Sequence, residues 1–200
     1  MSEHMKYILP LLLMLVSYST FGQQHQLGLR LGDPYGVTYK TPINDKFSLE
    51  GILGRGSQNS GQYYRRTFEN NRPVSSARYY AHQVSGAFSL QARGIYEEAF
   101  TEDFNISEGE LTVYAGLGLQ FRSVSIDYYY STPNASEDAP ELVESRSNID
   151  FGPEVFVGSS YYFEDLPIAL FVEFGFLTEI VDRLHLKGQG AIGARYLFGK

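Results

Sequence analysis

Residues 111–122 read LTVYAGLGLQFR, and this stretch decides the fold. Every second residue from Leu111 to Phe121 is apolar, whereas the residues between them are small or polar and end in Gln120 and Arg122. An alternation of period two is the pattern of a β-strand whose two faces meet different surroundings. The stretch therefore predicts a strand with one apolar face and one polar face.

The same alternation recurs along the chain after residue 23, and turn signals divide it into eight predicted strands. These strands are expected at 24–32, 35–41, 46–58, 83–99, 109–127, 148–162, 167–180 and 186–198. Three short links alternate with a second set of links that contains the two longest, 59–82 and 128–147. Short turns at one end and longer loops at the other are typical of outer-membrane barrels, which have an even number of strands. The pattern predicts an all-β protein, an eight-stranded antiparallel up-and-down transmembrane β-barrel.

The N-terminus has the features of an export signal. Lys6 precedes an apolar run at Ile8–Val16 that is too short to span a membrane, and small and polar residues follow up to Gly22. This order is typical of a cleavable secretory signal peptide. We predict a signal peptide at 1–22 and a barrel domain at 23–200, with translation starting at Met1 or at Met5. The predicted location is the bacterial outer membrane.

Composition narrows the class of protein. The chain has no cysteine, so a disulfide framework is excluded, and its net charge of −7 argues against nucleic acid as a partner. No apolar run approaches the roughly 20 residues that a membrane helix needs. The mean hydropathy of −0.23 is that of a soluble protein, but alternation cancels the apolar signal in a barrel.

The two strand faces differ in charge. The apolar face is nearly free of charge and ends in aromatics suited to a membrane interface, at Tyr39, Phe47, Tyr96, Tyr161 and Phe198. Pro153 falls in the middle of this face, where we expect a bulge or a register shift, because proline lacks a ladder donor. The opposite face carries charges of both signs, which predict a packed network in the lumen: Arg30, Lys40, Glu50, Arg93, Glu97, Arg122, Glu154, Glu173, Glu179 and Arg195. The alternative is a soluble, lipocalin-like barrel whose charged face meets water.

The last strand carries the sharpest motif. Gly193, Tyr196 and Phe198 have the spacing of the C-terminal signal read by the barrel-assembly machinery, although Ala191 replaces a usual polar residue and Gly199-Lys200 follow. On the evidence of this strand and of the stretch 27–40, residues 23–200 resemble the OmpA/OmpX-like eight-stranded outer-membrane barrels. These belong to the broad porin-like group of outer membrane protein β-barrel domains. The resemblance implies assembly by that machinery among outer-membrane lipid and lipopolysaccharide. Members differ widely in role, so it implies a fold more than a function.

The sequence gives little support for catalysis. In the predicted mature chain, His82 and Ser85 are the only histidine and serine close together in sequence. They fall on opposite faces of a strand, whereas a serine nucleophile needs its base within hydrogen-bond reach. The remaining mature histidines are His25, near the predicted new N-terminus, and His185, in a short link. No metal-binding spacing and no cofactor motif appears. We predict that the protein is not an enzyme and has no cofactor or metal.

The link at 59–82 is rich in tyrosine and arginine on both sides of a turn at 70–73, in a near-mirror order. This order predicts a hairpin that continues the third and fourth strands beyond the membrane, and such residues are common in binding hot spots. Its arginines could instead contact lipopolysaccharide phosphates. The candidate interaction residues are Tyr63, Tyr64, Arg65, Arg66, Arg78, Tyr79 and Tyr80.

These observations predict a non-catalytic outer-membrane barrel that serves interaction, adhesion or envelope integrity, with an extracellular protein or glycan as a possible ligand. A minor porin-like channel is the first alternative, and a lipid-modifying enzyme is the second.

Overall fold

The computed structural model describes residues 24–133, 142–181 and 184–199, and the predicted signal peptide lies outside this part of the chain. Within the described residues, the helix present is not long and apolar enough to cross a membrane. The elements are β1 (His25–Gly32), β2 (Tyr35–Pro42), β3 (Phe47–Arg55), α2 (Gly61–Asn70), β4 (Arg78–Ala99), β5 (Glu110–Ser131), β6 (Leu142–Tyr162), β7 (Ile168–Glu179) and β8 (His185–Phe198).

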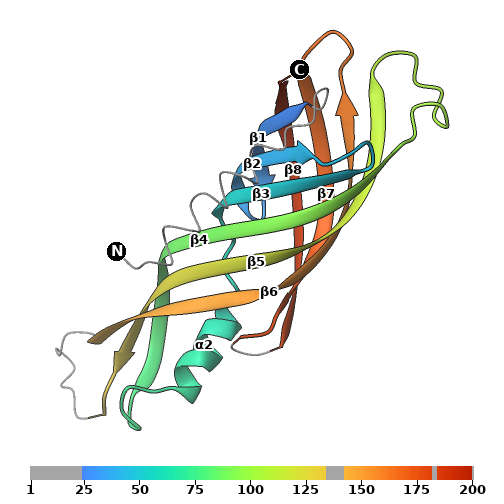
Figure 1. Cartoon of the computed structure of the whole chain (residues 1–200). Helices are drawn as coiled ribbons and strands as arrows, with labels where there is room; N and C mark the ends of the chain where they lie inside the picture. The colour runs from blue at the N-terminus through green and yellow to red at the C-terminus, as the bar shows by residue number, and fades with distance from the viewer. Residues whose placement is uncertain (1–23, 134–141, 182–183, 200) are drawn as a thin grey trace, which may run out of the picture.

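The strands form a closed antiparallel barrel in sequence order (Figure 1). β1 pairs with β8 from His25↔Phe198 to Gly32↔Ala191, so no strand is left without a neighbour at the seam. The predicted break between the first two strands at 33–34 is confirmed, and it makes the strand number even. We call the end with residues 25 and 198 the terminal end, and the opposite end, which carries α2, the loop end.

The alternating side chains divide between the lumen and the outside as the sequence predicts. On β5, Leu117 is 68% exposed on the outside, whereas Gln120 is fully buried in the lumen. Outward residues of β5 are apolar from Leu111 to Phe121 and polar from Ser123 onward. At about 3.4 Å per residue and a tilt of about 40°, this apolar stretch projects to roughly 26 Å along the barrel axis. That height matches the apolar band of a membrane barrel, about 25 Å.

Three strands continue past this band at the loop end (Figure 1). β4 pairs with β3 only as far as Ser89, and β6 pairs with β7 only as far as Glu154, yet all three strands β4–β6 run on together to Arg78, Ser131 and Leu142. We call residues 78–88, 121–131 and 142–153 the protruding sheet. Register shifts between Tyr79/Ala81 and Val84/Gly86 change which residues of β4 face inward.

The predicted hairpin at 59–82 is wrong for its first half. Tyr63, Tyr64, Arg65 and Arg66 lie in α2, whereas Arg78, Tyr79 and Tyr80 do extend β4. The physical reason is the spacing of the large apolar side chains. Tyr64 and Phe68 are four residues apart and share one face of a helix, which packs on Val124, Ile126 and Tyr128 of the protruding sheet. Ser60 caps the helix by accepting a hydrogen bond from the Tyr63 backbone N–H.

The expected bulge or register shift at Pro153 is not found. The β5–β6 pairing is continuous from Gln120↔Gly152 to Leu119↔Pro153. On the other side, Ile180 N donates to Phe151 O at 3.0 Å, which is the same register as the Glu154↔Leu177 pair. Pro153 therefore interrupts the ladder with β7 for one residue, because it has no N–H to donate, without displacing the strand.

The position of the apolar band can be tested on one face of one strand. Leu117→Arg should destabilise the folded protein in lipid vesicles by about 2–4 kcal/mol, because it places a charge at the middle of the band. Ser125→Arg points outward from the same strand but lies in the protruding sheet, so it should change stability by less than about 0.5 kcal/mol. Urea titration of both variants measures this difference, and equal effects would contradict the membrane assignment.

Candidate functional site

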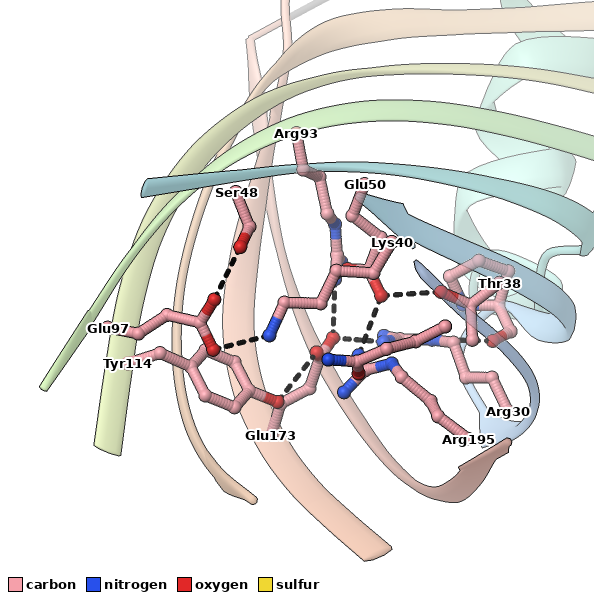
Figure 2. A network of polar contacts seen from close by, with 12 residues as sticks. Arg30, Thr38, Lys40, Ser48, Glu50, Arg93, Glu97, Tyr114, Glu173 and Arg195 are labelled. Atoms are coloured by element: carbon pink, nitrogen blue, oxygen red, sulfur yellow. Dashed lines mark hydrogen bonds and ion pairs between the residues drawn. The ribbon is translucent and has the colours of Figure 1, made fainter. Parts of the chain in front are cut away.

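The lumen contains a cluster of three arginines and three glutamates centred on Arg93. Figure 2 labels its members Arg30, Glu50, Arg93, Glu173 and Arg195. The Arg93 guanidinium binds both carboxylate oxygens of Glu154, at 2.7 and 3.1 Å, and one oxygen of Glu173 at 2.6 Å. It also lies 3.5 Å from Glu50. These partners come from β3, β6 and β7, so one side chain of β4 ties four strands together.

The other two arginines complete the cluster. Arg30 pairs with Glu173, and Arg195 Nη2 donates to Glu50 Oε1 at 2.6 Å. All six side chains are almost completely buried and their formal charges cancel. The equal numbers of arginines and glutamates matter for stability. An unpaired charge in a dry interior destabilises the fold by several kcal/mol, whereas a paired and hydrogen-bonded charge is tolerated.

Aromatic rings fill the space around these charges. The Arg195 guanidinium lies 3.8 Å from the centre of the Phe171 ring, and that of Arg93 lies 4.2 Å from the centre of Phe156. Stacking of this kind stabilises a buried guanidinium. Phe171 and a further lumen ring, Tyr114, fit because each lies opposite a glycine. A Cβ on Gly193 would overlap Phe171, and a Cβ on Gly158 would overlap Tyr114.

A second ion pair lies toward the terminal end. Lys40 of β2 pairs with Glu97 of β4, and the Ser48 hydroxyl donates to the other Glu97 oxygen at 2.6 Å (Figure 2). Lys40 is buried, whereas Glu97 retains some exposure. This pair forms the boundary between the packed lumen and the terminal end.

A third group of polar residues closes the loop end, and of its four members the sequence predicted only Arg122. Arg122 binds Asp150 and donates to the Asn59 side chain at 3.1 Å and to the Ser57 carbonyl at 3.3 Å. Asp150 could have been found, since it is four residues from Glu154 and therefore on the same strand face. Ser57 and Asn59 could not, because the predicted strand 46–58 ends at Arg55 in the structure, and Ser57 contributes only its backbone carbonyl.

The predicted lumen residue Glu179 contacts the helix. Tyr63 of α2 donates its hydroxyl to Glu179 at 3.0 Å, and the backbone N–H of Asn59 donates to the Tyr64 hydroxyl at 3.0 Å. Tyr63, Tyr64 and Phe68 are buried against the inner face of the protruding sheet. α2 thereby covers the loop end of the barrel.

Burial shifts the pKa values of two titratable groups at the α2 contact in the direction that favours their neutral forms. Burial raises the pKa of the Tyr64 phenol above its ordinary value. Burial also lowers the pKa of His82, whose ring lies in the protruding part of β4, 5.1 Å from that of Tyr64. Both shifts disfavour a charge in the apolar contact between the helix and the sheet.

The candidate interaction residues are divided by this arrangement. Tyr63 and Tyr64 are buried under the sheet and are not available to a partner, whereas Arg65 and Arg66 are exposed on α2. Arg78 and Tyr80 are exposed on β4, and Tyr79 is half-buried, with its hydroxyl 2.6 Å from His82 Nδ1.

The structure brings no base to the serine considered above. His82 faces α2, while Ser85 points outward and donates its hydroxyl to the Ser125 carbonyl. Within residues 24–133, 142–181 and 184–199, no group of three or more His, Cys, Asp or Glu side chains is placed to hold a metal ion.

The C-terminal motif lies on β8. Gly193 is covered by the Phe171 ring, Tyr196 is 56% exposed on the outer face, and Phe198 packs beside His25 and Tyr39. These outward aromatics join Phe47 and Tyr96, whose rings are 5.2 Å apart, around the terminal end.

Comparison with solved structures identifies the fold. The N-terminal β-barrel domain of Pseudomonas aeruginosa OprF matches with a TM-score of 0.53 at 11% identity, over 88% of this chain and 96% of that one. Together with the closed ring of eight strands, this match decides the fold. The chain has the eight-stranded barrel fold of the OmpA/OmpX-like outer-membrane type.

Other barrels match less closely. Ail, the attachment invasion locus protein of Yersinia pestis, has a TM-score of 0.42 at 12% identity, over 88% of this chain and 95% of that one. Neisserial surface protein A has a TM-score of 0.40 at 13% identity, over 88% and 94%. No protein-family model and no curated protein sequence matches the chain. At these identities the likeness is one of fold.

The energetic role of the lumen can be tested at Glu173. Glu173→Ala should lower the free energy of unfolding by about 3–5 kcal/mol, because it leaves Arg30 and Arg93 buried with fewer partners. Glu98→Ala breaks the exposed pair with Lys46 and should cause no measurable change. Both variants are to be compared by urea titration in the same vesicles. Equal stability would mean that the cluster does not hold the barrel together.

The filled lumen also has a consequence for ion transport. We expect no steady conductance from the purified, folded protein in planar bilayers, because arginines, glutamates and aromatic rings occupy the cross-section of a narrow eight-stranded barrel. Reproducible single-channel steps would contradict this expectation and favour the porin-like alternative.

Proposed function

We propose that the protein is an exported, non-catalytic barrel of the bacterial outer membrane, and that its protruding sheet binds an extended segment of an extracellular protein. The observation that carries this proposal is the unpaired edge of β6. The loop end is taken as extracellular, because the longer links and the protruding strands gather there and outer-membrane barrels keep short turns on the periplasmic side.

The direction of the backbone groups on β6 follows from one hydrogen bond. The Phe151 carbonyl accepts from Ile180, so the backbone of Phe151 points toward the β7 side. Backbone direction alternates along a strand, and the β5–β6 pairing is continuous through this region. Val143, Ser145 and Ser147 therefore direct their N–H and C=O groups to the same side. Beyond Glu154↔Leu177, no strand pairing with β7 is found among the described residues.

An edge of this kind is a template for another strand. Its donors and acceptors gain their full hydrogen bonds only when an extended chain lies beside them. The side chains of Val143, Ser145 and Ser147 are exposed, so a partner strand has access from the outside. Exposed Arg78 and Tyr80 on β4 of the same sheet supply residue types that are common at binding hot spots.

Contacts with the envelope are part of the same proposal. Arg66, Arg72 and Arg78 are exposed at the loop end, where their guanidinium groups can pair with lipopolysaccharide phosphates. At the terminal end, Gly193, Tyr196 and Phe198 are proposed as the signal that the barrel-assembly machinery reads. The second candidate ligand of these exposed arginines is an anionic glycan, which guanidinium groups bind in the same way as phosphate.

A single edge position separates strand addition from other modes of binding. Ser147→Pro removes one free N–H on the open side of β6, whereas Ser147→Ala removes the same hydroxyl and keeps that N–H. In a non-adherent Gram-negative host, the proline variant should lose most of the adherence to a layer of extracellular-matrix protein that wild type confers. The alanine variant should retain it.

Both variants must first be found in the outer-membrane fraction and must change mobility on gels after boiling, which shows that they are folded. Unchanged adherence of the folded proline variant would exclude the β6 edge as the binding surface. Absence of adherence in wild type, with sensitivity to detergents when the protein is deleted, would favour the role in envelope integrity.

A further inference from the structure

The terminal end of the barrel opens into a cavity of about 780 Å³. The cavity lies among the strand ends and the turns at 43–46, 100–109 and 163–167, and it stops at the Lys40–Glu97 pair that closes the lumen. Its volume is in the range of pockets that hold small organic ligands, about 300–1,000 Å³. This end is opposite the proposed binding sheet, so its chemistry is independent of the proposed function.

The side chains that line the cavity have one sign of charge. Five carboxylates and no Lys or Arg line it: Asp45, Glu97, Glu98, Glu110 and Glu164. Lys40 and Lys46 neutralise Glu97 and Glu98. The other three carboxylates have no ion-pair partner among the described residues, so the described side chains of the lining carry a residual charge of −3. Such a cavity concentrates cations and excludes anions.

A buried amide gives an independent sign of a missing ligand. Gln26 lines the inner part of the cavity and is only 7% exposed. Its Nε2 donates to the Tyr162 hydroxyl at 3.3 Å, but its Oε1 has no hydrogen-bond partner in the described part of the chain. A buried carbonyl oxygen without a donor is unfavourable, and an N–H group of a ligand in the cavity would satisfy it.

The spacing of the carboxylates indicates the kind of cation. The described residues contain no cluster of acidic side chains tight enough to hold a metal ion, so the negative charge is spread around the cavity rather than focused at one point. Spread charge suits a ligand whose positive groups are separated along a chain. Pro42, Phe163 and Leu197 also line the cavity and offer apolar contact to the methylene groups between such charges.

We propose that this cavity binds a linear aliphatic oligoamine, with one ammonium donating to Gln26 Oε1 and the others paired with Asp45, Glu110 and Glu164. The ligand brings only N–H donors to a cavity rich in acceptors, and its two or three charges match the residual charge of the site. It enters from the side on which both ends of the barrel chain lie, which is the periplasm in the proposed orientation.

The test uses the full, folded barrel in nanodiscs of phosphatidylcholine, a lipid without net charge, with spermidine as the probe in calorimetric titration at low salt. We expect saturable binding of one spermidine per barrel. The triple variant Asp45→Asn, Glu110→Gln, Glu164→Gln should bind at least tenfold more weakly, because it removes the three unpaired charges. All three side chains are exposed, so this variant should fold normally.

Two further variants separate a built site from general attraction to an acidic protein. Gln26→Leu should weaken binding about tenfold, through loss of a hydrogen bond to a charged group, with folding checked by gel mobility. Asp127→Asn, in the protruding sheet at the opposite end, makes the same charge change as one of the cavity substitutions and should leave the affinity unchanged.

Several results would overturn the proposal. These are an undiminished affinity in the triple variant, an equal loss in Asp127→Asn, or complete displacement of spermidine by an equimolar amount of Mg²⁺. Binding of a lysine-rich peptide without any binding of spermidine would also overturn it, and would assign the cavity to a basic segment of a periplasmic protein.

Discussion

The guanidinium of Arg93 is the interaction on which the rest of the barrel depends. It is shared by glutamates from three other strands, and Arg30 and Arg195 complete their coordination. A membrane barrel cannot use an apolar core, because its apolar side chains face lipid. The polar groups of its interior must therefore pair with one another. The six charges cancel in pairs, and the Arg195 guanidinium, whose Nε and Nη1 have no hydrogen-bond partner among the described residues, stacks on Phe171 instead. This requirement also explains why the lumen is packed rather than open.

The same constraint explains how much of the fold could be predicted. A strand between lipid and a polar lumen must alternate strictly, and Leu111–Arg122 shows this without ambiguity. The lumen residues followed from strand parity, which would also have supplied Asp150. From Ser123 onward the alternation is reversed, because Val124 and Ile126 point inward and the outward residues are polar. The run Tyr128–Tyr130 then shows no alternation at all, and the predicted strand therefore ended four residues too early.

Residues 59–82 show where such reasoning fails. Their near-mirror order suggested a hairpin, but the spacing of Tyr64 and Phe68 is helical. The helix forms because these two side chains pack on the apolar surface of Val124, Ile126 and Tyr128. That packing surface belongs to a distant part of the sequence, so the local pattern could not reveal it. The two register shifts in β4 were likewise invisible, although they turn His82 and Val84 toward the helix. Gln26 was overlooked because a neutral residue near a strand start carries no signal until its neighbours are known.

The contacts between glycine and aromatic rings in the lumen have a consequence for the history of such a chain. Phe171 occupies the space left by Gly193 on the neighbouring strand, and Tyr114 occupies the space left by Gly158. A side chain added at either glycine requires a smaller ring residue opposite it, and a lost ring leaves a void that only a larger neighbour refills. Positions on adjacent strands are therefore bound to change together. We expect the sequence of this barrel to diverge by compensating substitutions on paired strands. The shape of the interior is then kept while the residues that fill it change.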